Sequence, residues 1–130
     1  MEFVIGGACQ GKQEFACRKY KLKAEEIIDG SAANREQLLN CRAVRDFHLY
    51  IKAALKRGED ADTLCENLLA ENPDVIIISN EIGYGIVPMD PEDRFWREKT
   101  GRVSCRIAAA SRNVYRVCMG IGTAIKETDQ

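Results

Sequence analysis

The chain has 130 residues, of which 45% are hydrophobic and 30% are charged, as in an ordinary globular domain. Its 19 basic and 20 acidic residues nearly cancel, so the charge balance favours neither nucleic acid nor an acidic membrane surface as a partner. Apolar runs such as residues 75–78 are far too short to cross a bilayer, and residues 1–5 lack the features of a secretion signal. We therefore expect a single cytoplasmic domain, residues 1–130, that does not enter a membrane.

The six cysteines are scattered without a Cys-x-x-Cys pair, and His48 is the only histidine. A zinc site needs clustered ligands, and small disulfide-bonded secreted domains are denser in cysteine. The sequence therefore predicts reduced cysteines, most of them packed as small apolar side chains. They are Cys9, Cys17, Cys41, Cys65, Cys105 and Cys118.

The first elements expected are a strand, a helix and a second strand. Residues 2–5 form a short apolar run that ends at a glycine turn, which predicts a buried strand. A helix is expected at residues 12–23, with its basic side chains outward. A very short strand follows at residues 26–28.

A long second helix is expected from Asn34 to Gly58. Asn34 is placed to cap its start, with Gln37 in capping-box position, and Gly58 ends it. His48 lies close to its apolar face and is expected to be a packed side chain rather than a catalytic base. The residues that recur there at helical spacing are Leu38, Cys41, Val44, Phe47, Ile51 and Leu55.

The second half of the chain continues the alternation of helices and strands. A helix is expected at residues 62–71, closed by Pro73. The β-branched run at residues 74–79 indicates a strand buried on both faces of a parallel sheet. It leads into a glycine-punctuated loop at residues 80–88.

The last helix is expected to begin at Pro91 with Asp90 as its cap. It continues to about residue 112 and is loosened at Gly101. A strand at residues 114–119 follows, and then a tail. Strands thus alternate with helices throughout, which predicts an α/β fold with a small, mainly parallel sheet.

Ligands of such sheets bind beyond the carboxyl ends of the strands, where three polar loops are expected, at residues 6–13, 29–31 and 80–85. The first of them fits the phosphate-binding pattern Gly-x-x-x-x-Gly-Lys-Ser/Thr at every position but the last. Glycines let the backbone wrap closely around an anion, and Lys12 would reach the outer phosphates. The amide of Gln13 replaces the hydroxyl that normally binds Mg²⁺. The nucleotide-binding residues predicted are Gly6, Gly7, Ala8, Cys9, Gln10, Gly11, Lys12 and Gln13.

Phosphoryl transfer also needs carboxylates near the phosphates. Asp29 follows the apolar pair at residues 27–28, where a carboxylate would hold Mg²⁺ directly or through water. Glu81 follows the next clear strand and would act as a base or a second metal partner. The predicted catalytic residues are Lys12, Asp29 and Glu81, and the predicted Mg²⁺ ligands are Asp29 and Gln13. Taken singly, Asp29 also suits a turn and Glu81 a solvated loop.

These motifs resemble the bifunctional adenosylcobinamide kinase/adenosylcobinamide-phosphate guanylyltransferase family of cobalamin biosynthesis. Its opening loop is similar to residues 6–13, and its Thr-Asn-Glu-Val-Gly-x-Gly-Ile-Val-Pro is similar to residues 79–88. The segment 94–101 resembles its Arg-x-Phe-Arg-Asp-x-x-Gly. The resemblance implies a three-layer P-loop NTPase-like (RecA-like) fold, ATP or GTP as ligand, a cobinamide-like corrinoid as acceptor, and a homo-oligomer. It also implies substrate binding by Asn80, Arg94 and Arg97.

The chain departs from the family pattern at Gln10 and Gln13, which replace two serines of the loop. A segment that carries the guanylylated histidine in the family is missing between Tyr20 and Glu26, and His48 does not match that histidine. The expected function is therefore nucleotide binding in the kinase half, with the guanylyltransferase activity lost. The alternative is a degenerate nucleotide- or anion-binding module without transferase activity.

Overall fold

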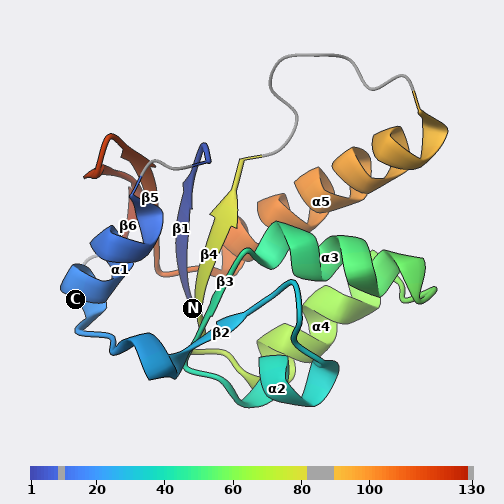
Figure 1. The fold of residues 1–130 in the computed structure, drawn as a ribbon, viewed down its shortest axis with the longest axis horizontal. Helices are drawn as coiled ribbons and strands as arrows, with labels where there is room; N and C mark the ends of the chain where they lie inside the picture. Colours follow the sequence, from blue (N-terminus) through green and yellow to red (C-terminus); the bar gives the residue numbers. More distant parts are fainter. Residues whose placement is uncertain (9–10, 82–89, 129–130) are drawn as a thin grey trace.

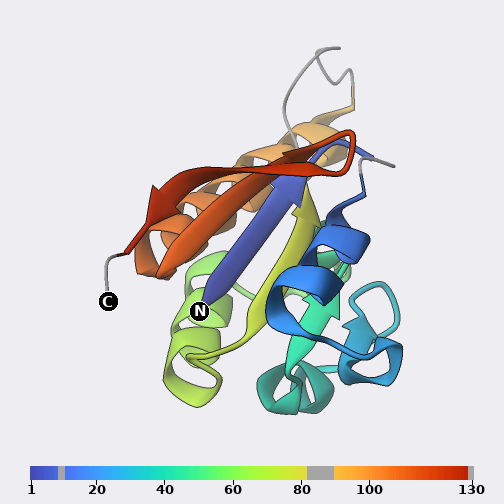
Figure 2. The same ribbon diagram turned by 90° about the vertical axis from the view of Figure 1, so that its left-hand side faces the viewer.

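A mainly parallel sheet forms the centre of the structure. The computed structural model describes residues 1–8, 11–81 and 90–128 (Figures 1 and 2). Within these residues the sheet has six strands in the order β2-β3-β4-β1-β5-β6, and only β5 and β6 pair antiparallel. The strands are β1 (Glu2–Gly6), β2 (Ile27–Asp29), β3 (Ala43–Arg45), β4 (Ile76–Asn80), β5 (Asn113–Cys118) and β6 (Ile121–Glu127).

Helices cover both faces of the sheet and give three layers (Figures 1 and 2). On one face α1 packs through Ala16 against Val4 and Val117. The opposite face is covered by α2–α5, which bury side chains such as Tyr50 and Leu68. The predicted three-layer α/β class with a mainly parallel sheet is therefore confirmed. The helices are α1 (Lys12–Tyr20), α2 (Arg35–Asn40), α3 (Phe47–Lys56), α4 (Ala61–Glu71) and α5 (Pro91–Ala110), with a 3₁₀ turn at Ala24–Glu26.

The central strands are apolar on both sides because both of their faces are covered. In β1, Phe3 faces the larger core and Val4 faces α1, and both are buried. In β4, Ile77 and Ile78 divide in the same way. The strand that was predicted at residues 74–79, buried on both faces, is therefore confirmed as β4.

The single long helix predicted from Asn34 to Gly58 is wrong. Its first part is the short helix α2, whose capping box between Asn34 and Gln37 forms as predicted. The chain then enters β3, where Ala43 and Val44 are fully buried between β2 and β4. Helical spacing could not reveal this strand because it is only three residues long, and pairing on both edges outweighs local propensity.

The tail after β5 is a further strand, β6, which the sequence did not predict. It lies antiparallel to β5 at the edge of the sheet, and Gly122 passes under the ring of Phe15. Helix α1 ends at Tyr20, before the predicted residue 23, because Lys21 adopts a left-handed conformation with φ of 54°. Helix α5 begins with Asp90 as its cap, as predicted, and passes through Gly101 without interruption.

The cysteines are packed less often than predicted. Within the described residues Cys65 is buried, Cys17 and Cys41 are half-buried, and Cys105 and Cys118 are exposed. None of the helices in this part of the chain has the length and the hydrophobicity to span a bilayer.

His48 is a packed side chain, as predicted, and it joins three elements. Its side chain is 5% exposed in the first turn of α3, and Nδ1 accepts a hydrogen bond from the backbone N–H of Asn80 at 3.2 Å. Its carbonyl oxygen accepts a hydrogen bond from Nε1 of Trp96 at 3.3 Å. Burial lowers the pKa of His48, the charge of Lys12 lowers it further, and Asp46 opposes the shift.

The buried position of β3 predicts the effect of shortening Val44. The Val44→Ala substitution should lower the free energy of unfolding by about 2 kcal/mol, because it removes buried carbons from a closed site. The matched substitution Ile125→Ala, on a side chain that is 56% exposed, should change it by less than about 0.5 kcal/mol. Urea denaturation of both variants measures the difference, and equal values would contradict the placement of β3.

The environment of His48 predicts a pH dependence of stability. The unfolded chain takes up a proton near the ordinary pKa of 6.5, whereas the folded chain does so only at lower pH. The free energy of unfolding should therefore fall as pH drops from about 7 to about 5.5. His48→Gln, which keeps a hydrogen-bond acceptor, should flatten this slope. Denaturation at several pH values is the measurement, and parallel slopes for both proteins would contradict the prediction.

Candidate functional site

The loop after β1 is held close to the sheet by two glycines. A Cβ atom on Gly6 would lie 2.5 Å from the carbonyl oxygen of Val117, so a side chain does not fit there. Gly11 precedes α1 with φ of 83°, in the left-handed region that glycine adopts without strain. The expected strand–loop–helix arrangement is thus present around the described loop residues. Cys9 and Gln10, which were also predicted to bind nucleotide, lie outside the described residues.

Lys12 begins α1 and turns back toward the loop. Its side chain is buried, and Nζ donates a hydrogen bond to the carbonyl oxygen of Gly7 at 2.7 Å. The start of a helix also carries backbone N–H groups and a partial positive charge. Both features suit an anion at this point.

A cavity of about 340 Å³ opens beside Lys12, at the carboxyl ends of β3 and β4. This volume is at the lower end of the range of small-ligand sites. The cavity joins the loop to side chains from β3 and β4, and its wall carries two cationic and two acidic groups. It is lined by Ala8, Gly11, Lys12, Gln13, Glu14, Arg45, Asp46, Ile78 and Asn80.

Asp46 is one of two acidic residues that line this cavity with Lys12, the other being Glu14, and the sequence did not predict it. It follows β3 directly and precedes α3, with φ of 52° and ψ of 43°. A non-glycine residue seldom adopts this left-handed conformation, and such residues concentrate at functional sites. The charged pair Arg45-Asp46 directly after the buried pair Ala43-Val44 was the available signal, but it was assigned to a helix interior.

Asp29 does not line the cavity, because its strand β2 is separated from β1 by β3 and β4. It accepts hydrogen bonds from the backbone N–H and the hydroxyl of Ser31, at 2.9 and 2.7 Å. Its other oxygen lies 3.3 Å from Nη2 of Arg45. These hydrogen bonds, with a smaller contribution from the Arg45 charge, lower the pKa of Asp29. The carboxylate of Asp29 therefore stays ionised at a lower pH than an ordinary aspartate does.

Asn80 ends β4 and Glu81 follows it, and of the two only Asn80 lines the cavity. The carboxylate of Glu81 accepts hydrogen bonds from Nε and Nη2 of Arg116 at 2.6 and 3.2 Å. Its backbone N–H donates to the carbonyl oxygen of Gly6 at 2.9 Å. Glu81 thus fixes the ends of β1, β4 and β5 together, at the edge where it was expected.

Arg94 and Arg97, predicted to bind substrate, lie on α5 and line neither of the two cavities described here. Arg94 is exposed in the first turn, and Arg97 is half-buried one turn later. Most of the predicted loop that precedes α5, residues 82–88, lies outside the described residues.

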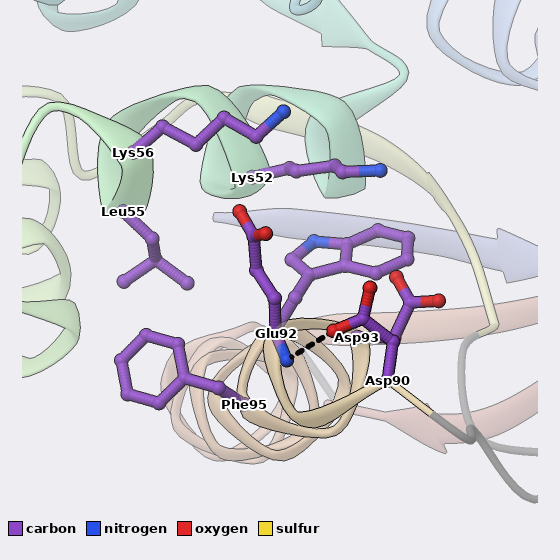
Figure 3. Close-up of a pocket in the computed structure, with 8 residues that line it drawn as sticks. Lys52, Leu55, Lys56, Asp90, Glu92, Asp93 and Phe95 are labelled. Atoms are coloured by element: carbon purple, nitrogen blue, oxygen red, sulfur yellow. Dashed lines mark hydrogen bonds between the residues drawn. The ribbon is translucent and has the colours of Figure 1, made fainter.

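A second cavity of about 460 Å³ lies between α3 and the first turns of α5 (Figure 3). Leu55 and Phe95 form its apolar side, and the acidic start of α5 faces Lys52 and Lys56 of α3. The ammonium of Lys52 lies 4.7 Å from the centre of the Trp96 ring. Phe95 and Trp96 thus both border this cavity.

Two curated proteins are similar to part of this chain. Both are bifunctional adenosylcobalamin biosynthesis proteins CobU. The protein from Salmonella typhimurium is 46% identical over 79 residues, which are 57% of this chain and 42% of that protein. The protein from Escherichia coli is 44% identical over 52 residues, 40% of this chain and 29% of that protein. The chain thus matches less than half of the length of either relative.

Among solved structures, the P4 protein of bacteriophage phi6 in complex with ADP aligns with a TM-score of 0.41 and 16% identity, over 98% of this chain and 55% of that one. The family model described as cobinamide kinase / cobinamide phosphate guanyltransferase matches residues 23–125. The match begins after the glycine loop and includes β2–β5 with α2–α5. The chain therefore belongs to the cobinamide kinase / cobinamide phosphate guanyltransferase family.

Proposed function

We propose that this chain binds ATP or GTP at the cavity beside Lys12 and acts in the kinase half of its family's chemistry. The observation that carries the proposal is the meeting of Lys12, Asp46 and Asn80 at one cavity, from three separate elements. A cation for the phosphates and a carboxylate for the acceptor are two of the parts that phosphoryl transfer requires. Membership of the family makes a corrinoid such as cobinamide the proposed acceptor.

The residues have distinct roles in this proposal. Lys12 would exchange its hydrogen bond with the Gly7 carbonyl for the outer phosphate oxygens. The acceptor hydroxyl would attack the γ-phosphorus while the bond to the β-phosphate oxygen breaks, and Asp46 would accept the hydroxyl proton. We assign this role to Asp46 because it lines the cavity beside Lys12, whereas Asp29 and Glu81 do not.

Mg²⁺ was predicted from the loop motif, with Asp29 and Gln13 as ligands, and the donor set fits it poorly. Gln13 offers an amide where a compact hydroxyl is usual, and Asp29 is outside the cavity. Asp46 is within the cavity, but its carboxylate is 3.1 Å from Nη1 of Arg45. This ion pair favours a second candidate function, nucleotide binding without transfer.

The guanylyltransferase activity is proposed to be absent. The connection from α1 to β2 consists of the few residues around the 3₁₀ turn Ala24–Glu26. It leaves no room for a further loop with a histidine. The only histidine, His48, is buried and uses Nδ1 to accept the N–H of Asn80. Self-association and a cytoplasmic location remain predictions.

Replacing Lys12 tests the binding site. Lys12→Met keeps the apolar stem but removes the ammonium, so affinity for ATP and GTP should fall by about tenfold or more. The control Arg18→Ala removes a cation from the last turn of the same helix and should leave affinity unchanged. Isothermal titration calorimetry measures both, and equal affinities would contradict the proposed role of Lys12.

The reaction itself is tested with cobinamide and Mg-ATP or Mg-GTP. The kinase proposal predicts phosphorylated cobinamide by mass spectrometry, its loss in Asp46→Asn, and no GMP attached to the protein. Nucleotide binding without any product would support the second candidate. A stable GMP adduct would contradict the proposed loss of guanylyl transfer.

A further inference from the structure

Arg45 is the second cation of the cavity, and it is held between two carboxylates. Its Nη1 lies 3.1 Å from Oδ2 of Asp46, and its Nη2 lies 3.3 Å from Oδ2 of Asp29. The backbone around it is fixed, because its carbonyl oxygen accepts the N–H of Gly30 at 2.8 Å. A Cβ atom on Gly30 would lie 2.7 Å from that same oxygen, so the turn after β2 fits closely against Arg45.

The guanidinium takes the place at Asp46 that a metal ion would need. A divalent cation next to Asp46 would lie a few ångströms from a permanently charged guanidinium, which repels it. The usual hydroxyl partner of the metal is absent as well, since Gln13 occupies its position. Gln13 in the loop and Arg45 beside Asp46 each remove a contact that Mg²⁺ would need. Arg45 also supplies a positive charge at the same place.

We propose that this site binds the phosphates of a nucleotide without Mg²⁺, and that the Arg45 guanidinium supplies the charge that the metal supplies in related loops. The inference rests on the nucleotide binding proposed above. Arginine suits the role because its planar group carries five N–H donors, which can contact a carboxylate and a phosphate oxygen together. Lys12 and Arg45 would then contact the phosphates from α1 and from the end of β3.

Asp29 is a positioning residue in this proposal. It contacts Arg45 from the side of β2 and is itself fixed by Ser31, whose backbone N–H and hydroxyl both donate to it. Its side chain is 36% exposed, so solvent screens its charge from a bound phosphate more than that of a buried carboxylate. Asp29 thus fixes the position of the guanidinium.

The test compares nucleotide affinity in excess EDTA and in millimolar MgCl₂, with ATP and GTP as probes, by isothermal titration calorimetry. The wild-type protein should bind with affinities within about threefold in the two conditions. Arg45→Ala should lose about tenfold or more in EDTA and recover in MgCl₂, because Asp46 is then open to the metal. The control Arg42→Ala removes a nearby exposed arginine, paired with Glu26 at 2.8 Å, and should behave as wild type.

Two results would overturn the inference: loss of wild-type binding in EDTA, or an Arg45→Ala variant whose affinity in EDTA equals that of wild type. Arg45→Lys keeps a positive charge but lacks the planar set of N–H donors, so its nucleotide affinity in EDTA should fall between those of wild type and Arg45→Ala. It replaces Arg45→Ala in the comparison if the alanine variant does not fold. Binding that needs Mg²⁺ would leave the proposed function intact and exclude only the metal-free site. An absence of binding in both conditions would exclude both proposals.

Discussion

The pairing of β3 between β2 and β4 is the constraint on which the rest of the site depends. Two residue pairs, Ala43 with Ile76 and Val44 with Ile77, fix its register, and the N–H of Ile76 donates to the carbonyl oxygen of Arg42 at 3.0 Å. This register determines where the strand stops. Arg45 and Asp46 therefore come out beside the glycine loop, and α3 begins at the same point.

The sequence predicted the structure correctly where a local motif and its neighbouring elements agree. The glycine loop lies between a strand and a helix as predicted, and the caps at Asn34 and Asp90 form because their side chains bond to the adjacent backbone. It failed where tertiary pairing decides the structure. β3 and β6 have no strong local signal, since one has three residues and the other is largely exposed.

The missed strand also explains the misplaced carboxylate. With β3 absent from the prediction, Asp29 after the apolar pair at residues 27–28 was the carboxylate expected near the loop. Inserting β3 moves Asp29 one strand further out and brings in Asp46. Asp46 thus lines the cavity beside Lys12, where Asp29 was expected. The order of the strands decides whether Asp29 or Asp46 lies at the cavity, and local sequence patterns do not reveal that order.

The division of the helices between the two faces bears on how the domain would respond to a ligand. α1 is joined to the sheet by the smaller of two hydrophobic cores and α3 belongs to the larger one, whereas β3 contributes Ala43 to the smaller core and Val44 to the larger. Lys12 and Arg45 therefore line the same cavity from α1 and from the sheet. A polyanion bound between them would link α1 to the sheet, so its binding energy would also resist their separation. Ligand occupancy would then make unfolding of the two layers more cooperative.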